Sequence, residues 1–112
     1  RAGTRLIVLD FADAIVGYAS YGRNRMPALG YGGEIFELYL APEYQGVGLG
    51  KRMFDAAKAD LAAHGLPSFV VWALGDNDRA VEFYERRGGA IVRRARERFG
   101  DETRERIAFA FE

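Results

Sequence analysis

The sequence predicts an α/β fold, built on a mixed, mostly antiparallel twisted sheet with elements in the order β-β-β-α-β-α-β-β. Three observations lead to this prediction: several short runs rich in β-branched and aromatic residues, two segments with helical apolar spacing, and a glycine-rich turn joining a strand to a helix. At 112 residues the chain is long enough for one hydrophobic core and too short for two. We therefore expect a single domain over residues 1–112.

The first third of the chain is predicted to form three strands. Residues 5–10 and 14–21 are β-rich runs separated by a short turn, which predicts a hairpin. Residues 22–33 are rich in glycine and polar side chains, a composition typical of a loop. Residues 34–40 (EIFELYL) predict a third strand, which ends at the proline that follows.

The next segment predicts a helix followed by a buried strand. From Leu49 onward, apolar residues recur at four-residue spacing with charged residues largely on the other side, as in an amphipathic helix. Gly65 and Pro67 are typical helix-ending residues. Residues 68–74 (SFVVWAL) are continuously apolar, which favours a central strand covered on both faces.

The last third predicts a second helix and a final hairpin. The helix is expected over about residues 78–87, with Asn77 or Asp78 as its N-cap. Residues 90–99 and 104–111 are predicted strands on either side of a glycine turn. Because crossovers between parallel strands are right-handed, the strands flanking the first helix should form a central βαβ unit.

Composition narrows the function classes. Sixteen basic and sixteen acidic residues cancel, so no global field draws the chain toward nucleic acid or an anionic membrane. With no cysteine and one histidine, the chain excludes a disulfide framework, a thiolate metal site and a cysteine nucleophile, and we expect no metal. No apolar run approaches membrane-spanning length. We therefore expect a cytoplasmic protein without a nucleic-acid or membrane partner.

The most informative segment is the loop QGVGLGK, from Gln45 to Lys51. It is no phosphate loop of nucleotide hydrolases, because arginine follows Lys51 where serine or threonine is required. It is no dinucleotide fingerprint either, because its third glycine, Gly50, comes one position too early. Consecutive N–H groups at a helix N-terminus nevertheless favour an anion, and a pyrophosphate fits that geometry. The alternative is a turn packed tightly between strand and helix.

Two segments resemble motifs of the GNAT superfamily of N-acetyltransferases. In YLAPEYQGVGLGKRMF, the residues Gln45, Gly48 and Gly50 match the acetyl-coenzyme A signature: Gln or Arg, two residues, Gly, one residue, then Gly or Ala. The segment NDRAVEFYERRG, from Asn77 to Gly88, matches the second family motif at every named position. Two such motifs at the family's usual separation indicate membership of the superfamily.

The chain departs from the family pattern in two respects. The resemblance covers the fold from its second strand onward, lacking the usual N-terminal strand and the two helices that wall the acceptor site. Since the sequence begins with Arg1 rather than methionine, we expect an N-terminally truncated domain. Gly89 stands where the family usually has an aromatic residue, which we expect to loosen one core contact.

The resemblance implies acetyl-CoA as the cofactor. A main-chain N–H near Leu38 would stabilise the oxyanion, Leu40 would pair with the pantetheine amide, and Asn77 would hydrogen-bond the cofactor arm. The residues implied to wrap the pyrophosphate are Gln45, Gly46, Val47, Gly48, Leu49, Gly50 and Lys51.

Direct acetyl transfer to an amine also needs a base for the amine and an acid for the departing thiolate. The resemblance implies Tyr84 as the acid, which also contacts the cofactor; the alternative is a core aromatic with a satisfied hydroxyl. Glu34 ranks first as the base, because it stands eleven residues before Gln45, the base position in the histone-modifying branch, and alternation places it on the face of Leu38. Glu37 is the second candidate, on the opposite face unless a bulge shifts the phase, and could instead anchor a cationic acceptor. For either glutamate the alternative is a solvated strand charge.

The predicted function is direct transfer of acetyl from acetyl-CoA to a primary amine of a small molecule or peptide. A non-catalytic acyl-CoA-binding or sensory module of the same fold is the alternative. A homodimer completed by strand exchange is also open, because truncation would expose sheet edges. Small polyamines, antibiotics, amino acids and peptide N-termini all remain candidate acceptors.

Overall fold

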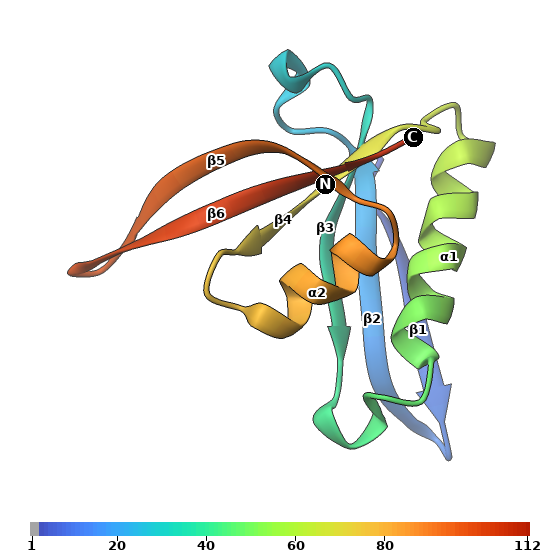
Figure 1. The fold of residues 1–112 in the computed structure, drawn as a ribbon. Helices are drawn as coiled ribbons and strands as arrows, with labels where there is room; N and C mark the ends of the chain where they lie inside the picture. Colours follow the sequence, from blue (N-terminus) through green and yellow to red (C-terminus); the bar gives the residue numbers. More distant parts are fainter. Residues whose placement is uncertain (1–2) are drawn as a thin grey trace.

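A computed structural model describes residues 3–112, which form one six-stranded sheet and two α-helices (Figure 1). The predicted order of elements is confirmed, and two strands are each two residues longer than predicted. The strands are β1 (Arg5–Phe11), β2 (Ala14–Arg23), β3 (Gly33–Leu40), β4 (Phe69–Leu74), β5 (Ala90–Phe99) and β6 (Glu102–Phe111). The helices are α1 (Leu49–Ala63) and α2 (Asp78–Arg86), and short 3-10 turns cover Pro27–Leu29 and Pro42–Tyr44.

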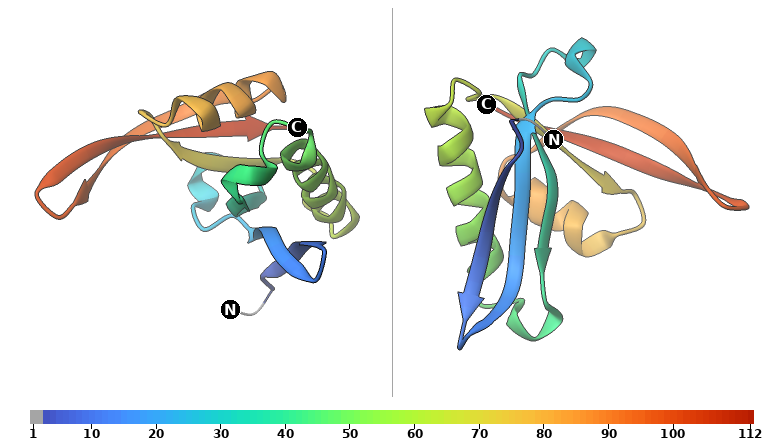
Figure 2. Two further views of the ribbon diagram at one scale, coloured as in Figure 1. Left: turned by 90° about the horizontal axis from the view of Figure 1, so that it is seen from below. Right: turned by 180° about the vertical axis from the view of Figure 1, so that it is seen from behind.

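The sheet has the strand order β1-β2-β3-β4-β6-β5. Only the β3–β4 pair is parallel among the described strands, and α1 connects the two as the predicted βαβ unit. Side chains of α1 and α2 belong to one core cluster, so both helices cover the same face of the sheet (Figure 2, left). We call this the helical face, and the opposite side the outer face. The β5–β6 hairpin projects beyond the rest of the sheet (Figures 1 and 2).

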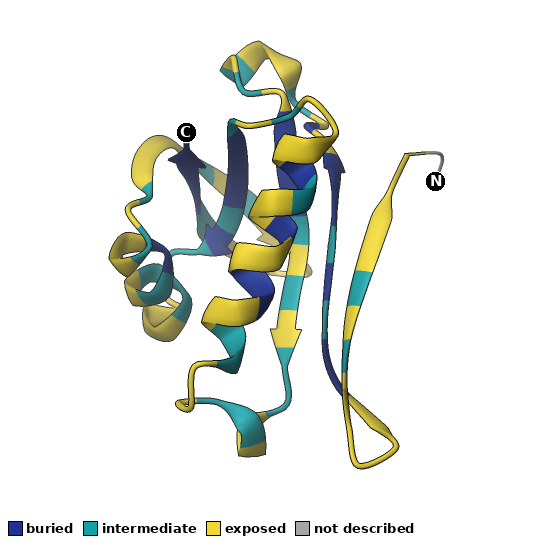
Figure 3. Ribbon diagram, turned by 90° about the vertical axis from the view of Figure 1, so that its right-hand side faces the viewer, coloured by how far each residue is buried: buried dark blue, intermediate teal, exposed yellow. Residues whose placement is uncertain are grey.

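Helix α1 begins and ends at glycines that take positive φ. Its N-cap is Gly48 (φ 85°), and Gly65 (φ 80°) follows its C-cap, as the sequence predicts. One side of the helix is buried against the sheet and the other is exposed, which Figure 3 shows as alternating dark and yellow segments along α1. The buried residues are Met53, Phe54, Ala57 and Leu61. The apolar side of the helix that the sequence predicts is therefore the side that faces the core.

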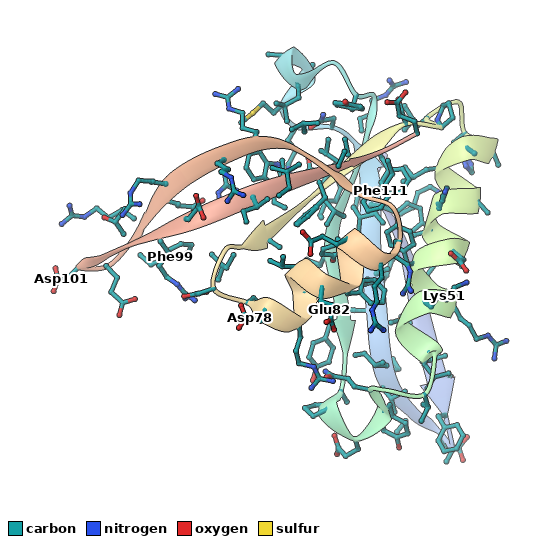
Figure 4. All side chains as sticks on the ribbon, in the orientation of Figure 1. Lys51, Asp78, Glu82, Phe99, Asp101 and Phe111 are labelled. Atoms are coloured by element: carbon teal, nitrogen blue, oxygen red, sulfur yellow. The ribbon has the colours of Figure 1, made fainter. Side chains whose placement is uncertain are left out.

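Aromatic rings fill the space between the helices and the sheet. The Phe111 ring lies 5.0 Å from that of Phe54 and 5.1 Å from that of Phe69, and Figure 4 labels Phe111 beside α1 and α2. A Cβ added at Gly89 would lie 2.7 Å from Cζ of Phe111 and 2.9 Å from the carbonyl oxygen of Tyr84. The expectation that Gly89 loosens a core contact is therefore wrong, because Phe111 occupies the space that a side chain there would need.

The face prediction for β3 is also wrong, because the strand carries one extra residue. Ser20 of β2 pairs with Glu37, but Tyr21 pairs with Ile35, so the register shifts at Phe36. Ile35 and Leu38 both pack on the helical face. Glu34, which simple alternation places with Leu38, therefore lies on the outer face with Glu37.

None of the helices within residues 3–112 combines the length and the apolar character that crossing a membrane requires.

Candidate functional site

A gap opens where β3 and β4 diverge. Their paired residues run only from Gly33 with Phe69 to Ile35 with Val71, after which the strands separate (Figure 1). On the β2 side, the N–H of Ala41 donates to the carbonyl of Val16 at 2.8 Å, and hydrogen-bonded pairs alternate along an antiparallel ladder. The N–H and C=O groups of positions 38 and 40 therefore point away from β2, into the gap.

The gap is closed at one end by the glycine loop. Gln45 Nε2 donates to the carbonyl of Leu40 at 2.8 Å, which ties the loop to the end of β3. Gly46 and Gly48 have φ of 84° and 85°, a region that glycine adopts without steric cost. Gly50 is helical, and an added Cβ there would make an ordinary contact of 3.5 Å with the Phe83 ring of α2.

The first turn of α1 presents bare backbone N–H groups. No side chain of the described chain caps it, and its first turn contains no acidic residue. The first N–H groups of a helix have no intrahelical partner, and the helix dipole adds positive potential there. Lys51 adds a cation, which forms an exposed ion pair with Asp55 at 2.9 Å. This arrangement suits an anionic group such as a phosphate.

The loop, α1, β3 and α2 enclose a pocket of about 550 Å³. It is lined by Leu38, Tyr39, Leu40, Gln45, Gly46, Gly48, Gly50, Lys51, Met53, Asn77, Arg79, Ala80, Glu82, Phe83, Tyr84, Arg86 and Arg87. Four of these side chains are cationic and one is anionic, so the pocket favours a negatively charged ligand. Lys51 and Glu82, labelled in Figure 4, mark its α1 and α2 sides. The β3 residues Leu38, Tyr39 and Leu40 all lie beyond the last pair with β4, so the pocket extends to the gap between the strands.

Most of the predicted cofactor residues line this pocket together. Val47 and Leu49 lie outside its lining, and Val47 is exposed. Three arginines of the pocket were not among the predicted site residues: Arg79 and Arg86 of α2, and Arg87 at its C-cap. Arg79 and Arg86 could have been recognised from the sequence, because residues seven positions apart lie on the same face of a helix.

Asn77 and Tyr84 bring the second motif to the same pocket. Asn77 is the N-cap of α2, and its Oδ1 accepts from the N–H of Ala80 at 3.2 Å, which leaves its amide nitrogen for a ligand. Tyr84 is 8% exposed, among aromatic rings of the core. Burial raises the pKa of its hydroxyl to about 12. The hydroxyl is therefore a proton donor at neutral pH and forms no hydrogen bond with another residue of the described chain.

Glu34 is buried and fully paired. It is 2% exposed, and its carboxylate accepts from Arg25 Nη2 at 2.7 Å, from Arg25 Nε at 3.2 Å and from the Arg25 backbone N–H at 2.9 Å. Arg25 lies in the loop that follows β2, and its guanidinium also stacks on Phe36 at 4.7 Å. The ion pair thus fixes this loop over the outer face.

Glu37 differs from Glu34 in its accessibility. It is exposed on the outer face, where its carboxylate accepts from the Ser20 hydroxyl at 3.2 Å and lies 3.5 Å from the Tyr18 hydroxyl. It is two residues beyond the last paired position of β3, beside the gap. Neither glutamate lines the 550 Å³ pocket, so both lie across the sheet from the cationic α2 side chains.

Two parallel strands diverge beside the N-terminus of a helix whose first N–H groups are uncapped, and the pocket at this point is cationic. These features are typical of an α/β protein that binds an elongated anionic ligand. Residues 1–89 match the Acetyltransferase (GNAT) family, and the chain belongs to this family.

Proteins with similar sequences and structures carry related names. The chain is 32% identical over 79 residues to the uncharacterized N-acetyltransferase YuaI of Bacillus subtilis, covering 70% of this chain and 45% of that protein. It is 32% identical over 93 residues to a mycothiol acetyltransferase of Propionibacterium freudenreichii, covering 78% of this chain and 28% of that protein. The chain thus spans less than half the length of these two relatives.

Solved structures share the fold over nearly the whole chain. A putative GNAT-family acetyltransferase from Desulfovibrio desulfuricans has a TM-score of 0.82 and 23% identity, covering 98% of this chain and 69% of its own. A putative streptothricin acetyltransferase from Bacillus anthracis, in complex with acetyl coenzyme A, has a TM-score of 0.80 and 18% identity, covering 99% of this chain and 63% of its own.

Proposed function

We propose that the chain is the cofactor-binding and catalytic part of an N-acetyltransferase, which transfers acetyl from acetyl-CoA to a primary amine. The observation that carries the proposal is the single pocket that joins the bare N–H groups of α1 to the gap between β3 and β4. The bound acetyl coenzyme A of the Bacillus anthracis relative supports the choice of ligand. When bound, acetyl-CoA supplies an activated thioester.

The chain's own groups would hold and polarise this thioester. The first N–H groups of α1 and the cations Lys51, Arg79 and Arg86 would bind the phosphates. The N–H of Leu38, directed into the gap, would donate to the thioester carbonyl oxygen, where negative charge develops during attack. Tyr84, whose hydroxyl is protonated at neutral pH, would donate a proton to the departing sulfur.

The amine would approach from the outer face, where the two candidate bases lie. An alkylamine with a pKa near 10.4 is roughly 0.1% neutral at pH 7.4, so a carboxylate that removes its proton accelerates the reaction. Glu37 fits this role better than Glu34. Its carboxylate is exposed beside the gap, whereas both oxygens of Glu34 are bound by Arg25.

Matched glutamine variants test this assignment. Glu37→Gln should lower kcat at neutral pH by roughly 10²-fold or more while leaving the fold intact, and raising the pH should recover much of the loss as the free amine becomes abundant. Glu34→Gln should mainly lower the melting temperature, because it breaks a buried ion pair. The measurement is thiol release from acetyl-CoA with a panel of amines. If acetyl-CoA binds but no amine elicits thiol release, the chain is instead a non-catalytic acyl-CoA-binding module.

A further inference from the structure

A second cavity, of about 280 Å³, lies on the outer face. It is lined by Arg25, Met26, Glu34, Trp72 and Arg106. Glu34 belongs to the paired part of β3, and Trp72 directly follows the last β4 residue that pairs with β3. The cavity therefore lies at the apex of the gap, on the side from which an amine would approach.

The groups of this cavity that have no hydrogen-bond partner among the described residues are N–H donors. The Glu34 carboxylate is satisfied by Arg25, whose Nη1 forms no hydrogen bond to any residue from 3 to 112. The guanidinium of Arg106 lies over the Trp72 ring at 4.3 Å. Its Nε is 2.7 Å from Oε1 of Glu97, yet this buried nitrogen lacks a hydrogen bond of good geometry, and its two Nη atoms have no partner among the described residues.

Two guanidinium groups with unused N–H donors form a typical site for a carboxylate. A guanidinium presents paired donors that match the two oxygens of a carboxylate, and it can stack on an aromatic ring at the same time. A second ammonium group would find no free acceptor here, because both nearby carboxylates are already paired with arginines.

We propose that this cavity binds a carboxylate of the acceptor, so that the substrate is an amine that also carries a carboxylate at a distance. The inference rests on the proposed acetyl transfer. Leu38 at the proposed reaction centre is three positions beyond Ile35 at the apex, which corresponds to roughly 10 Å along the strand. An extended tripeptide spans a similar length, whereas the two groups of a single α-amino acid are too close together. Short peptides with a free C-terminus are therefore the acceptor class.

The single tryptophan of the chain makes the cavity directly observable. Trp72 lines it, so the fluorescence of this residue reports occupancy without any turnover. Triglycine should change the emission saturably, and triglycinamide, which lacks the carboxylate, should have no effect. Arg106→Gln should abolish the response, and Arg106→Lys, which keeps the charge but loses the paired donors, should weaken it. Arg93→Gln is the matched control, because Arg93 is an exposed arginine of β5 outside this cavity's lining.

Turnover gives the second readout. We expect kcat/KM for triglycine to exceed that for triglycinamide by at least about tenfold, and Arg106→Gln to bring the ratio of the two values close to one. Equal turnover of acid and amide would overturn the inference and leave the transferase proposal intact. If no amine elicits thiol release from acetyl-CoA, the transferase proposal fails, and the fluorescence titration still tests whether the cavity binds a carboxylate. A response to triglycine alone supports carboxylate binding, and an equal response to triglycine and triglycinamide overturns it.

Discussion

Two buried tyrosines allow a paired test of the proposed acid. Tyr84 lines the pocket that we propose binds the cofactor, and burial raises its pKa to about 12. Tyr21, on β2, is 2% exposed and has a pKa that is also raised to about 12, first by burial and then by its hydrogen bond of 2.8 Å to Asp60. The two hydroxyls are thus similar in acidity but different in location, so replacing each with phenylalanine separates catalysis from stability.

The raised pKa sets the expected pH behaviour. At pH 9 a tyrosine of pKa 10 is about 10% ionised, whereas one of pKa 12 is about 0.1% ionised. Tyr84 therefore remains a donor over the whole range in which the amine loses its proton. Its removal should cost roughly 10²- to 10⁴-fold in kcat, the usual contribution of a positioned acid. Stability should change little, because the hydroxyl forms no hydrogen bond to another described residue.

The assay is thiol release from acetyl-CoA, combined with thermal unfolding of each variant. Tyr84→Phe should lose activity and keep its melting temperature. Tyr21→Phe should keep activity and melt at a lower temperature, because it loses the contact with Asp60. Full activity in Tyr84→Phe, or an equal loss in both variants, would refute the assignment of Tyr84 as the acid.

Three further predictions follow from the glycines and from the pKa of Tyr84. Gly89→Ala should destabilise the fold by about 1–3 kcal/mol in urea unfolding, because its Cβ would lie 2.7 Å from the Phe111 ring; an unchanged midpoint would contradict the described packing. Gly48→Ala should cost about 1–2 kcal/mol of backbone strain at the left-handed N-cap, and it should weaken coenzyme A binding measured by calorimetry. Gly50→Ala should retain this binding, because its Cβ would make an ordinary 3.5 Å contact. Equal binding by the two variants would show that the loop geometry is not required. The pKa of Tyr84 is near 10 in the unfolded chain and about 12 in the folded protein. Its contribution to the free energy of unfolding is therefore complete below pH 10 and is lost as the pH rises through 12. Between these pH values the free energy of unfolding should fall by up to about 3 kcal/mol, and it should fall less steeply in Tyr84→Phe.

The order of elements, and the fact that most of the predicted residues line one pocket, could be predicted because each depends on local signals. The helical spacing from Leu49, the stop at Gly65 and the two motifs all act through residues close together in the chain. The pocket forms where the strand before the loop and the second helix meet the N-terminus of α1, and the right-handed βαβ unit accounts for the first of these two contacts.

The outer face could not be predicted, because it depends on a single inserted residue and on contacts between distant segments. The extra residue at Phe36 moves Leu38 to the helical face, and no propensity in EIFELYL signals this shift. The partner of Glu34 comes from Arg25, in a segment identified only as a loop. Arg106 and Trp72 come together through the pairing of β4 with β6. Such contacts depend on the register in which the strands pair. That register is set by the packing of the whole sheet and cannot be read from one strand.

The most direct test is an amide NMR titration of ¹⁵N-labelled protein with coenzyme A. If the N–H groups at the start of α1 bind the diphosphate beside the gap, the largest shifts should fall on Gly46 to Lys51 and on Leu38, with little change along the projecting β5–β6 hairpin. Binding that leaves these amides unperturbed, or shifts concentrated elsewhere on the sheet, would contradict the proposed site and the acetyl transfer that depends on it.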